Sequence, residues 1–164
     1  MNILVLLPDL QSNSFTPQEI IDRQNVYALA VKKLKGRQKV KMIAVYSHCS
    51  EALNTREVEL KCVSRSQISV IRFAMHTLRY VKRVGFIPES IIAGTPFQPL
   101  LAALMLKLFI PSARIHTAVH GDLASLIDNS LKNRLKMWFL RFSIRQCSSI
   151  DSSLCPNLKK LHNF

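Results

Sequence analysis

Short hydrophobic runs alternate with amphipathic segments along the whole chain. Four runs end at a proline, a glycine or a polar residue and are typical of strands buried on both faces; they cover residues 2–7, 40–46, 90–93 and 114–120. Weaker runs predict two further strands, at 58–63 and 150–154. Between the strands, apolar residues recur at helical spacing. This spacing predicts helices over 17–35, 67–84, 97–109 and 131–146.

The alternation predicts an α/β fold: a Rossmann-like, doubly wound parallel sheet with helices on both faces. The first helix carries its own boundary signals. Thr16 and Glu19 form a capping-box pattern around Pro17, and Gly36 marks the end of the helix. A length of 164 residues suits a single domain with a core. A mean hydropathy of +0.13 argues against disorder.

The charge changes this picture because it is strongly positive and unevenly spread. The net charge is +13, of which residues 1–60 contribute +2 and residues 61–164 contribute +11. Such an excess indicates an anionic partner: membrane headgroups, a phosphorylated substrate or nucleic acid. No helix-turn-helix, zinc-finger spacing or aromatic-studded strand accompanies the charge. We therefore do not expect a nucleic-acid partner.

The cysteines and the N-terminus bear on location. None of the four cysteines, Cys49, Cys62, Cys147 and Cys155, forms a Cys-x-x-Cys pair, so buried thiols in a reducing compartment are expected. The N-terminus lacks the basic segment of a signal peptide. The longest apolar run, 99–110, contains Lys107 and is shorter than the about 20 residues of a bilayer span. The expected location is the cytoplasm, and peripheral attachment to the inner face of the membrane stays open.

Two strand ends carry the candidate chemistry. Gly94 and Thr95 follow one predicted strand, and the next strand ends in His120, Gly121 and Asp122. Ligands of open parallel sheets bind outside the carboxyl ends of the strands. There His120 could handle a proton or bind substrate, and the carboxylate of Asp122 could bind a hydroxyl group. The alternative is a Gly-Asp loop that only caps the following segment.

His116 lies four residues before His120 on the same predicted strand. We expect a buried, hydrogen-bonded core histidine there. The two histidines lack a third ligand of metal-binding type. No metal site is therefore expected.

The predicted helix 131–146 combines an apolar stripe with basic residues. The stripe consists of Leu131, Leu135, Trp138 and Phe142, and the basic residues around it are Lys132, Arg134, Lys136, Arg141 and Arg145. This pattern has two interpretations: a helix that faces the core and solvates its basic side, or a helix that rests on anionic lipid. In the second case Lys132, Lys136 and Arg141 are the expected membrane contacts.

Taken together, these motifs resemble the N-terminal half of a glycosyltransferase family 4 enzyme. The matching features are the first strand, the strand end at Gly94, the Leu-rich helix and the following strand that ends in His120-Gly121-Asp122. The basic helix and the Ile150-Asp151-Ser152-Ser153 segment complete the pattern. The resemblance implies that residues 1–164 form one Rossmann-like lobe of a two-lobed GT-B-type fold.

The resemblance also implies a function. This lobe would bind a glycan or lipid-linked acceptor, with His120 as catalytic residue and Gly94, Thr95, Gly121 and Asp122 as acceptor-binding residues. A second lobe would bind the nucleotide sugar, and neither a metal nor another cofactor is required. Two departures stand out: residues 8–17 contain no glycine, and the donor lobe is absent from the sequence. We therefore expect no sugar transfer by this chain alone. The alternative is a non-catalytic Rossmann-like module that binds anionic membrane or a protein partner.

Overall fold

The computed structural model shows an α/β fold built on one mostly parallel sheet. It describes residues 1–7, 16–34, 36, 39–47, 53–64, 68–94, 97–118 and 131–151. Within these ranges the sheet has seven strands in the order β3-β4-β2-β1-β5-β6-β7. Their bounds are Asn2–Leu7 (β1), Lys41–Ser47 (β2), Leu53–Asn54 (β3), Val58–Ser64 (β4), Ser90–Ala93 (β5), Arg114–Ala118 (β6) and Ser149–Asp151 (β7). All neighbours are parallel except β3, which runs antiparallel to β4. The α/β prediction is confirmed.

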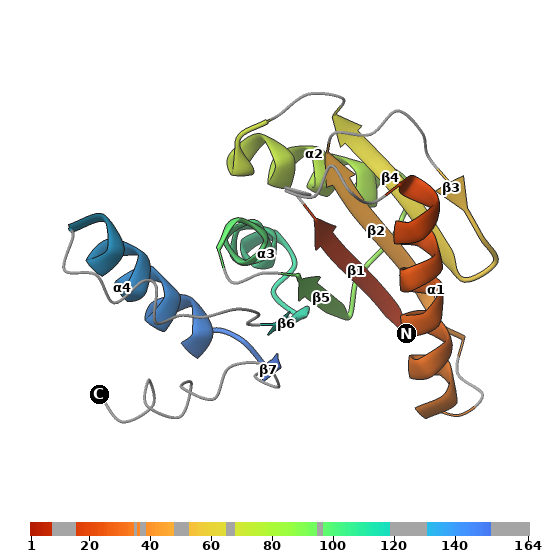
Figure 1. The fold of residues 1–164 in the computed structure, drawn as a ribbon. Coiled ribbons are helices and arrows are strands. Elements are labelled where there is room, and N and C mark those ends of the chain that lie inside the picture. Colours follow the sequence, from red (N-terminus) through yellow and green to blue (C-terminus); the bar gives the residue numbers. More distant parts are fainter. Residues whose placement is uncertain are drawn as a thin grey trace.

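Helices cover both faces of the sheet (Figure 1). Helix α1 (Pro17–Leu34) packs on one face, and α2 (Val70–Arg83) and α3 (Gln98–Phe109) pack on the other. Helix α4 (Leu131–Arg145) contacts α3, on the side of α3 away from α2 (Figure 1). Helices can pack on both faces because alternate residues of each apolar strand point to opposite faces of the sheet.

Strand β1 shows how this alternation builds two cores. Ile3 and Val5 pack with α1, whereas Leu4 and Leu6 pack with α2 and α3, and all four are buried. The neighbouring strand β2 alternates in the same way. A strand sandwiched between two apolar layers must be apolar throughout. The continuous hydrophobic runs of the sequence therefore correspond to the centre of the sheet.

The caps that the sequence indicates are present. The backbone N–H of Thr16 donates to Glu19 Oε2 at 2.6 Å, and the N–H of Glu19 donates to Thr16 Oγ1 at 3.3 Å. These reciprocal bonds are the predicted capping box. Gly36 adopts a φ of 71°, the left-handed conformation that follows many helices. The second helix begins later than predicted, because Ser69 caps it by accepting from the N–H of Arg72 at 3.4 Å.

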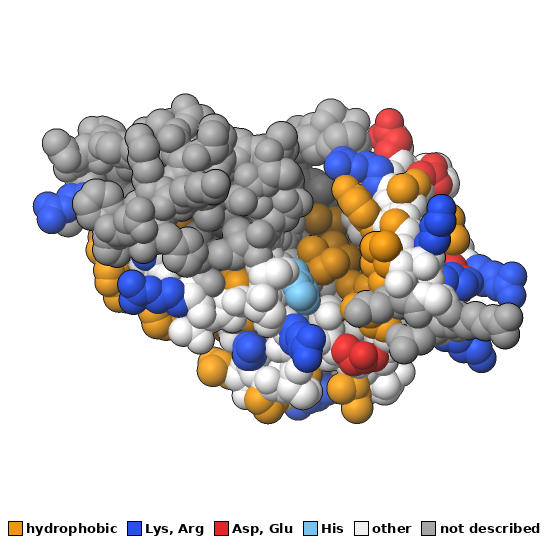
Figure 2. Space-filling view, turned by 90° about the horizontal axis from the view of Figure 1, so that it is seen from below, with side chains coloured by type: hydrophobic (Ala, Val, Ile, Leu, Met, Phe, Trp, Pro, Cys, Tyr) orange, Lys and Arg blue, Asp and Glu red, His pale blue; other side chains and the backbone are white. Residues whose placement is uncertain are grey.

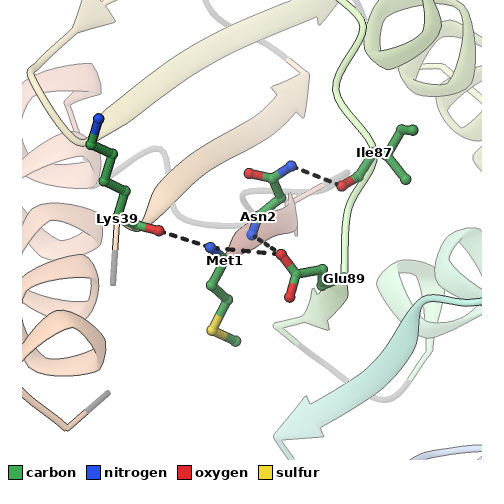
Figure 3. A network of polar contacts seen from close by, with 5 residues as sticks. All are labelled: Met1, Asn2, Lys39, Ile87 and Glu89. Carbon is green, nitrogen blue, oxygen red and sulfur yellow. Dashed lines mark hydrogen bonds and ion pairs between the residues drawn. The ribbon is translucent and has the colours of Figure 1, made fainter. Parts of the chain in front are cut away.

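At the amino edge of the sheet, a polar network holds β1 in register (Figure 3). The Met1 ammonium donates to the Lys39 carbonyl at 2.7 Å and lies 3.6 Å from Glu89 Oε1. The same carboxylate accepts from the N–H of Asn2 at 3.0 Å, and the Asn2 amide donates to the Ile87 carbonyl at 3.0 Å. This network joins the chain segments that lead into β1, β2 and β5.

Two details differ from the sequence-based expectation. The short strand β3 lies between the predicted strands 40–46 and 58–63, where the sequence predicts no element. Its two residues are too few for a periodic signal. The described part of β6 ends at Ala118, so the predicted continuation to residue 120 lies outside the described residues, as do the end of the sixth predicted strand and the C-terminal segment. None of the helices in the described ranges is both long and apolar enough to cross a membrane.

Candidate functional site

The winding of the chain marks one position on the carboxyl edge of the sheet. From β1 the chain proceeds through α1 to β2 on one side, whereas β5, β6 and β7 lie on the other side of β1. The direction of winding therefore reverses between β1 and β5. In open α/β sheets the crevice outside such a reversal is the usual ligand site. We therefore place the candidate site of this chain at the carboxyl ends of β1 and β5, after Leu7 and Ala93.

Gly94 lies at this reversal, directly after β5. A Cβ atom added to it would lie 3.3 Å from Leu7 Cδ2 and 3.8 Å from the Leu6 carbonyl oxygen. The first distance is tighter than ordinary van der Waals contact, so a side chain would have to displace Leu7. The glycine thus lets the chain after β5 pass close to the end of β1. Of the predicted acceptor-binding residues, Gly94 is the one that the structure describes.

The other predicted residues at this edge, Thr95, His120, Gly121 and Asp122, lie outside the described residues. Their strands are nevertheless neighbours. Strand β6 pairs with β5 in parallel, and Ala93 is opposite Thr117. The Thr117 hydroxyl donates to the Ala93 carbonyl at 3.3 Å and joins the two strands just below their ends. The assignment of His120 as a catalytic residue stays a prediction.

Helix α3 begins four residues after Gly94. Its first turn contains no acidic residue, and its N-cap, Phe97, makes no side-chain capping bond. The N-terminus of a helix carries a partial positive charge and free N–H groups. The first turn of α1 differs, because Glu19 there binds the backbone N–H of Thr16. Among the described residues, no acidic side chain of the first turn of α3 offsets this charge, so the helix end suits an anionic or hydroxyl-bearing ligand.

A row of side chains crosses the sheet on the side of α1. Register pairs Val5 with Ile92, Ile92 with His116 and His116 with Ser149, so all four share a face. Val5 is buried, Ile92 and His116 are half-buried, and Ser149 is exposed. Coverage by α1 thus declines from β1 towards β7. Seen from below, hydrophobic side chains line a hollow beside α1, with a histidine side chain at its margin (Figure 2).

His116 is hydrogen-bonded, as expected, but it is not a fully buried core histidine. Its Nδ1 lies 2.5 Å from Ser149 Oγ. Partial burial, together with the positive charge of Arg114, holds the pKa of His116 below its ordinary value. The expectation of a buried histidine is met only in part, because α1 packs on β2, β3 and β4 whereas His116 lies on β6, on the other side of β1. The serine partner gave no sequence signal, since it comes from a strand 33 residues away.

The structure shows which described side chains of the basic helix face the core. In α4, Leu140 and Ser143 are fully buried, and Cys147 just after the helix packs against the core of α2 and α3. Trp138 and Phe142 of the predicted apolar stripe are exposed instead. The stripe therefore does not face the core. Arg141 is exposed, whereas the side chains of Lys132 and Lys136 lie outside the described residues.

Comparison with known proteins adds no assignment to this geometry. No protein-family model matches the chain, and no curated protein matches it. Within the described ranges, no three histidine, cysteine, aspartate or glutamate side chains gather in a group that could hold a metal ion. The features of the described chain that bear on function are the sheet edge at Gly94 and the exposed surface of α4. The sequence did not predict that Leu7 lies beside Gly94. The signal that could have indicated it is that the strand order of such sheets usually reverses next to a central first strand.

Proposed function

We propose that this chain is the acceptor-side lobe of a GT-B-type glycosyltransferase. The lobe would hold a glycan or lipid-linked acceptor, and a nucleotide sugar would be presented by a second, donor-binding lobe. The observation that carries the proposal is the reversal of the strand order between β1 and β5, where Gly94 lies close to Leu7. The resemblance of the motifs from residue 91 to 161 to glycosyltransferase family 4 supports the same assignment.

The chemistry proposed for the site needs few groups. The acceptor hydroxyl must be oriented and its proton must have a path away as the glycosidic bond forms. His120 would supply the base or a hydrogen bond to the sugar, and Asp122 would bind an acceptor hydroxyl. Thr95 and Gly121 would contact the acceptor through the loops after β5 and β6. The positive end of α3 would favour an acceptor that carries a phosphate or several hydroxyl groups.

Glycan binding by the purified chain tests this proposal. We expect retention on a glycan array, confirmed by saturation-transfer NMR with the retained glycan. Gly94→Val should abolish the signal, because its side chain would fill the space between the ends of β5 and β1. The control is Ala30→Val on the exposed side of α1, which should leave binding unchanged. Equal binding by Gly94→Val would contradict the site.

A second pair of variants tests the residue predicted to act on the acceptor. His120→Ala should weaken glycan binding, whereas His76→Ala, on the exposed side of α2, should not. We expect the chain alone to release no nucleoside diphosphate from nucleotide sugars, since the donor would need the second lobe. Turnover by the 164-residue chain would contradict the division of labour between lobes. A chain that retains no glycan would favour the alternative, a non-catalytic binding module.

A further inference from the structure

Helix α4 presents an apolar surface to solvent. Three large side chains of one stripe are exposed: Leu135 at 60%, Trp138 at 67% and Phe142 at 50%. Among the α4 side chains that the structure describes, Leu140 and Ser143 are the buried ones. A surface helix usually places its largest apolar residues inward. In α4, Leu135, Trp138 and Phe142 point outward instead, and they stay exposed in the part of the chain that the structure describes.

The two aromatic rings of this stripe are stacked on each other. The Trp138 and Phe142 ring centroids lie 5.9 Å apart, and the ring planes differ by 9°. They are one helical turn apart, which is the spacing at which side chains stack along a helix. Indole and phenyl rings held in this way bury a large area when they enter an apolar medium. The pair therefore gives α4 a preformed apolar contact surface.

Arginines lie beside this surface. Arg134, Arg141 and Arg145 are exposed, and together with Trp138 they follow the spacing of one helical row. The sequence of α4, from residue 131 to 145, holds five basic residues and no acidic one. Among the side chains that the structure describes, no acidic group forms an ion pair with these three arginines. On the left of Figure 2, where α4 lies, basic and hydrophobic side chains are exposed side by side.

We propose that the outer face of α4, made of Leu135, Trp138, Phe142, Arg134, Arg141 and Arg145, docks on an anionic lipid surface. An anionic lipid surface can bind the apolar side chains and the arginines of this face at the same time. The aromatic rings and Leu135 enter the boundary between headgroups and acyl chains, and the guanidinium groups stay at the level of the phosphates. Nucleic acid would match the arginines but would leave Leu135 without an apolar partner. The helix lies in the plane of the interface, since none of the described helices can span a bilayer.

Vesicle sedimentation tests the proposal. The probes are vesicles of phosphatidylcholine alone and of phosphatidylcholine mixed with phosphatidylglycerol. We expect the chain to sediment with the mixed vesicles and to remain in solution with the neutral ones. Binding should weaken with salt, because the screening length falls from about 10 Å at 0.1 M to about 3 Å at 1 M. Equal binding to both kinds of vesicle, or binding to neither, would overturn the proposal.

Matched charge reversals assign the binding to α4. Arg134→Glu/Arg141→Glu should lower the partition coefficient by at least about 25-fold, since each basic group near an anionic surface contributes about fivefold. The control is Arg72→Glu/Arg79→Glu, which reverses two exposed arginines at the same seven-residue spacing on α2. It should retain binding within about threefold. An equal loss of binding in both double variants would show that net charge alone drives binding. Binding of a DNA duplex through Arg134 and Arg141, without binding to vesicles, would indicate nucleic acid. Either result contradicts the proposal.

Discussion

Helices α2 and α4 have similar sequences in one respect and opposite roles in the structure. Both are basic and neither contains an acidic residue. Helix α2 turns its apolar side, including Phe73 and Leu78, into the core and exposes Arg72 and Arg79. Helix α4 exposes Trp138 and Phe142 beside its arginines. The two helices therefore differ not in charge but in the direction of their large apolar side chains, and this difference motivates the lipid proposal for α4.

The environment of each helix explains the difference. Helix α2 lies over the sheet and against α3, so a wide surface is available to cover its apolar side. Helix α4 contacts α3 and leads into β7, a strand of three residues at the edge of the sheet. Of the described α4 side chains, Leu140 and Ser143 are buried there. The large side chains on its remaining surface have no apolar partner within the described chain.

The largest expected effect is on the free energy of unfolding, and it distinguishes the apolar side of α2 from that of α4. Phe73→Ala in α2 should cost about 3–5 kcal/mol, because it leaves a cavity at a fully buried position. Phe142→Ala in α4 should cost less than about 1 kcal/mol, because half of its side chain is already exposed. Denaturant unfolding of the two variants measures both values. Similar losses would show that the α4 stripe belongs to the core after all.

The inner side of α4 offers a chemical test of its burial. Burial raises the pKa of Cys147 to about 11 from an ordinary 9.0. The reactive thiolate at pH 8 should therefore be about 100-fold scarcer than for an ordinary thiol. We expect slow alkylation of Cys147 by iodoacetamide, measured by mass spectrometry, and fast alkylation in denaturant. Fast alkylation of the folded chain would mean that this side of the helix is open.

The cap of α2 provides a smaller test. Ser69→Ala removes the acceptor for the backbone N–H of Arg72 and should cost about 1 kcal/mol in unfolding free energy. Ser69→Asp should restore stability, since aspartate caps equally well and its negative charge suits a helix N-terminus. Neither substitution should alter vesicle binding. A change in vesicle binding would show that α2 takes part in the contact that we assign to α4.

The smallest expected effect concerns pH. The folded-state pKa of His116 is held below its ordinary value of 6.5. The unfolded state therefore binds the proton more readily, and stability rises as pH increases towards and through about 6.5. Thermal melts across this range should show less stabilisation in His116→Gln than in the original chain. An unchanged pH dependence in the variant would show that His116 is not the group responsible.

The sequence predicted the parts of this fold that depend on local chemistry. The strands of the sheet centre are continuous apolar runs, and the capping box at Thr16 and Glu19 fixes where α1 begins. The sequence did not predict that β1 lies beside β5, because the order in which strands pair is not contained in any local pattern. The spacing of Leu135, Trp138 and Phe142 predicted the stripe, but spacing does not reveal which way a stripe faces. The site residues from Thr95 to Asp122 rest on resemblance, so their roles stay predictions.

The emission of Trp138 tests the account of α4 most directly, because this residue is the single tryptophan of the chain and is 67% exposed. With vesicles that contain phosphatidylglycerol, its emission should shift to shorter wavelength and be quenched by lipids brominated near the headgroup. Neutral vesicles should leave it unchanged, and Arg134→Glu/Arg141→Glu should lose the shift. Emission that stays at its aqueous wavelength on anionic vesicles would contradict the assignment of this face to a lipid surface.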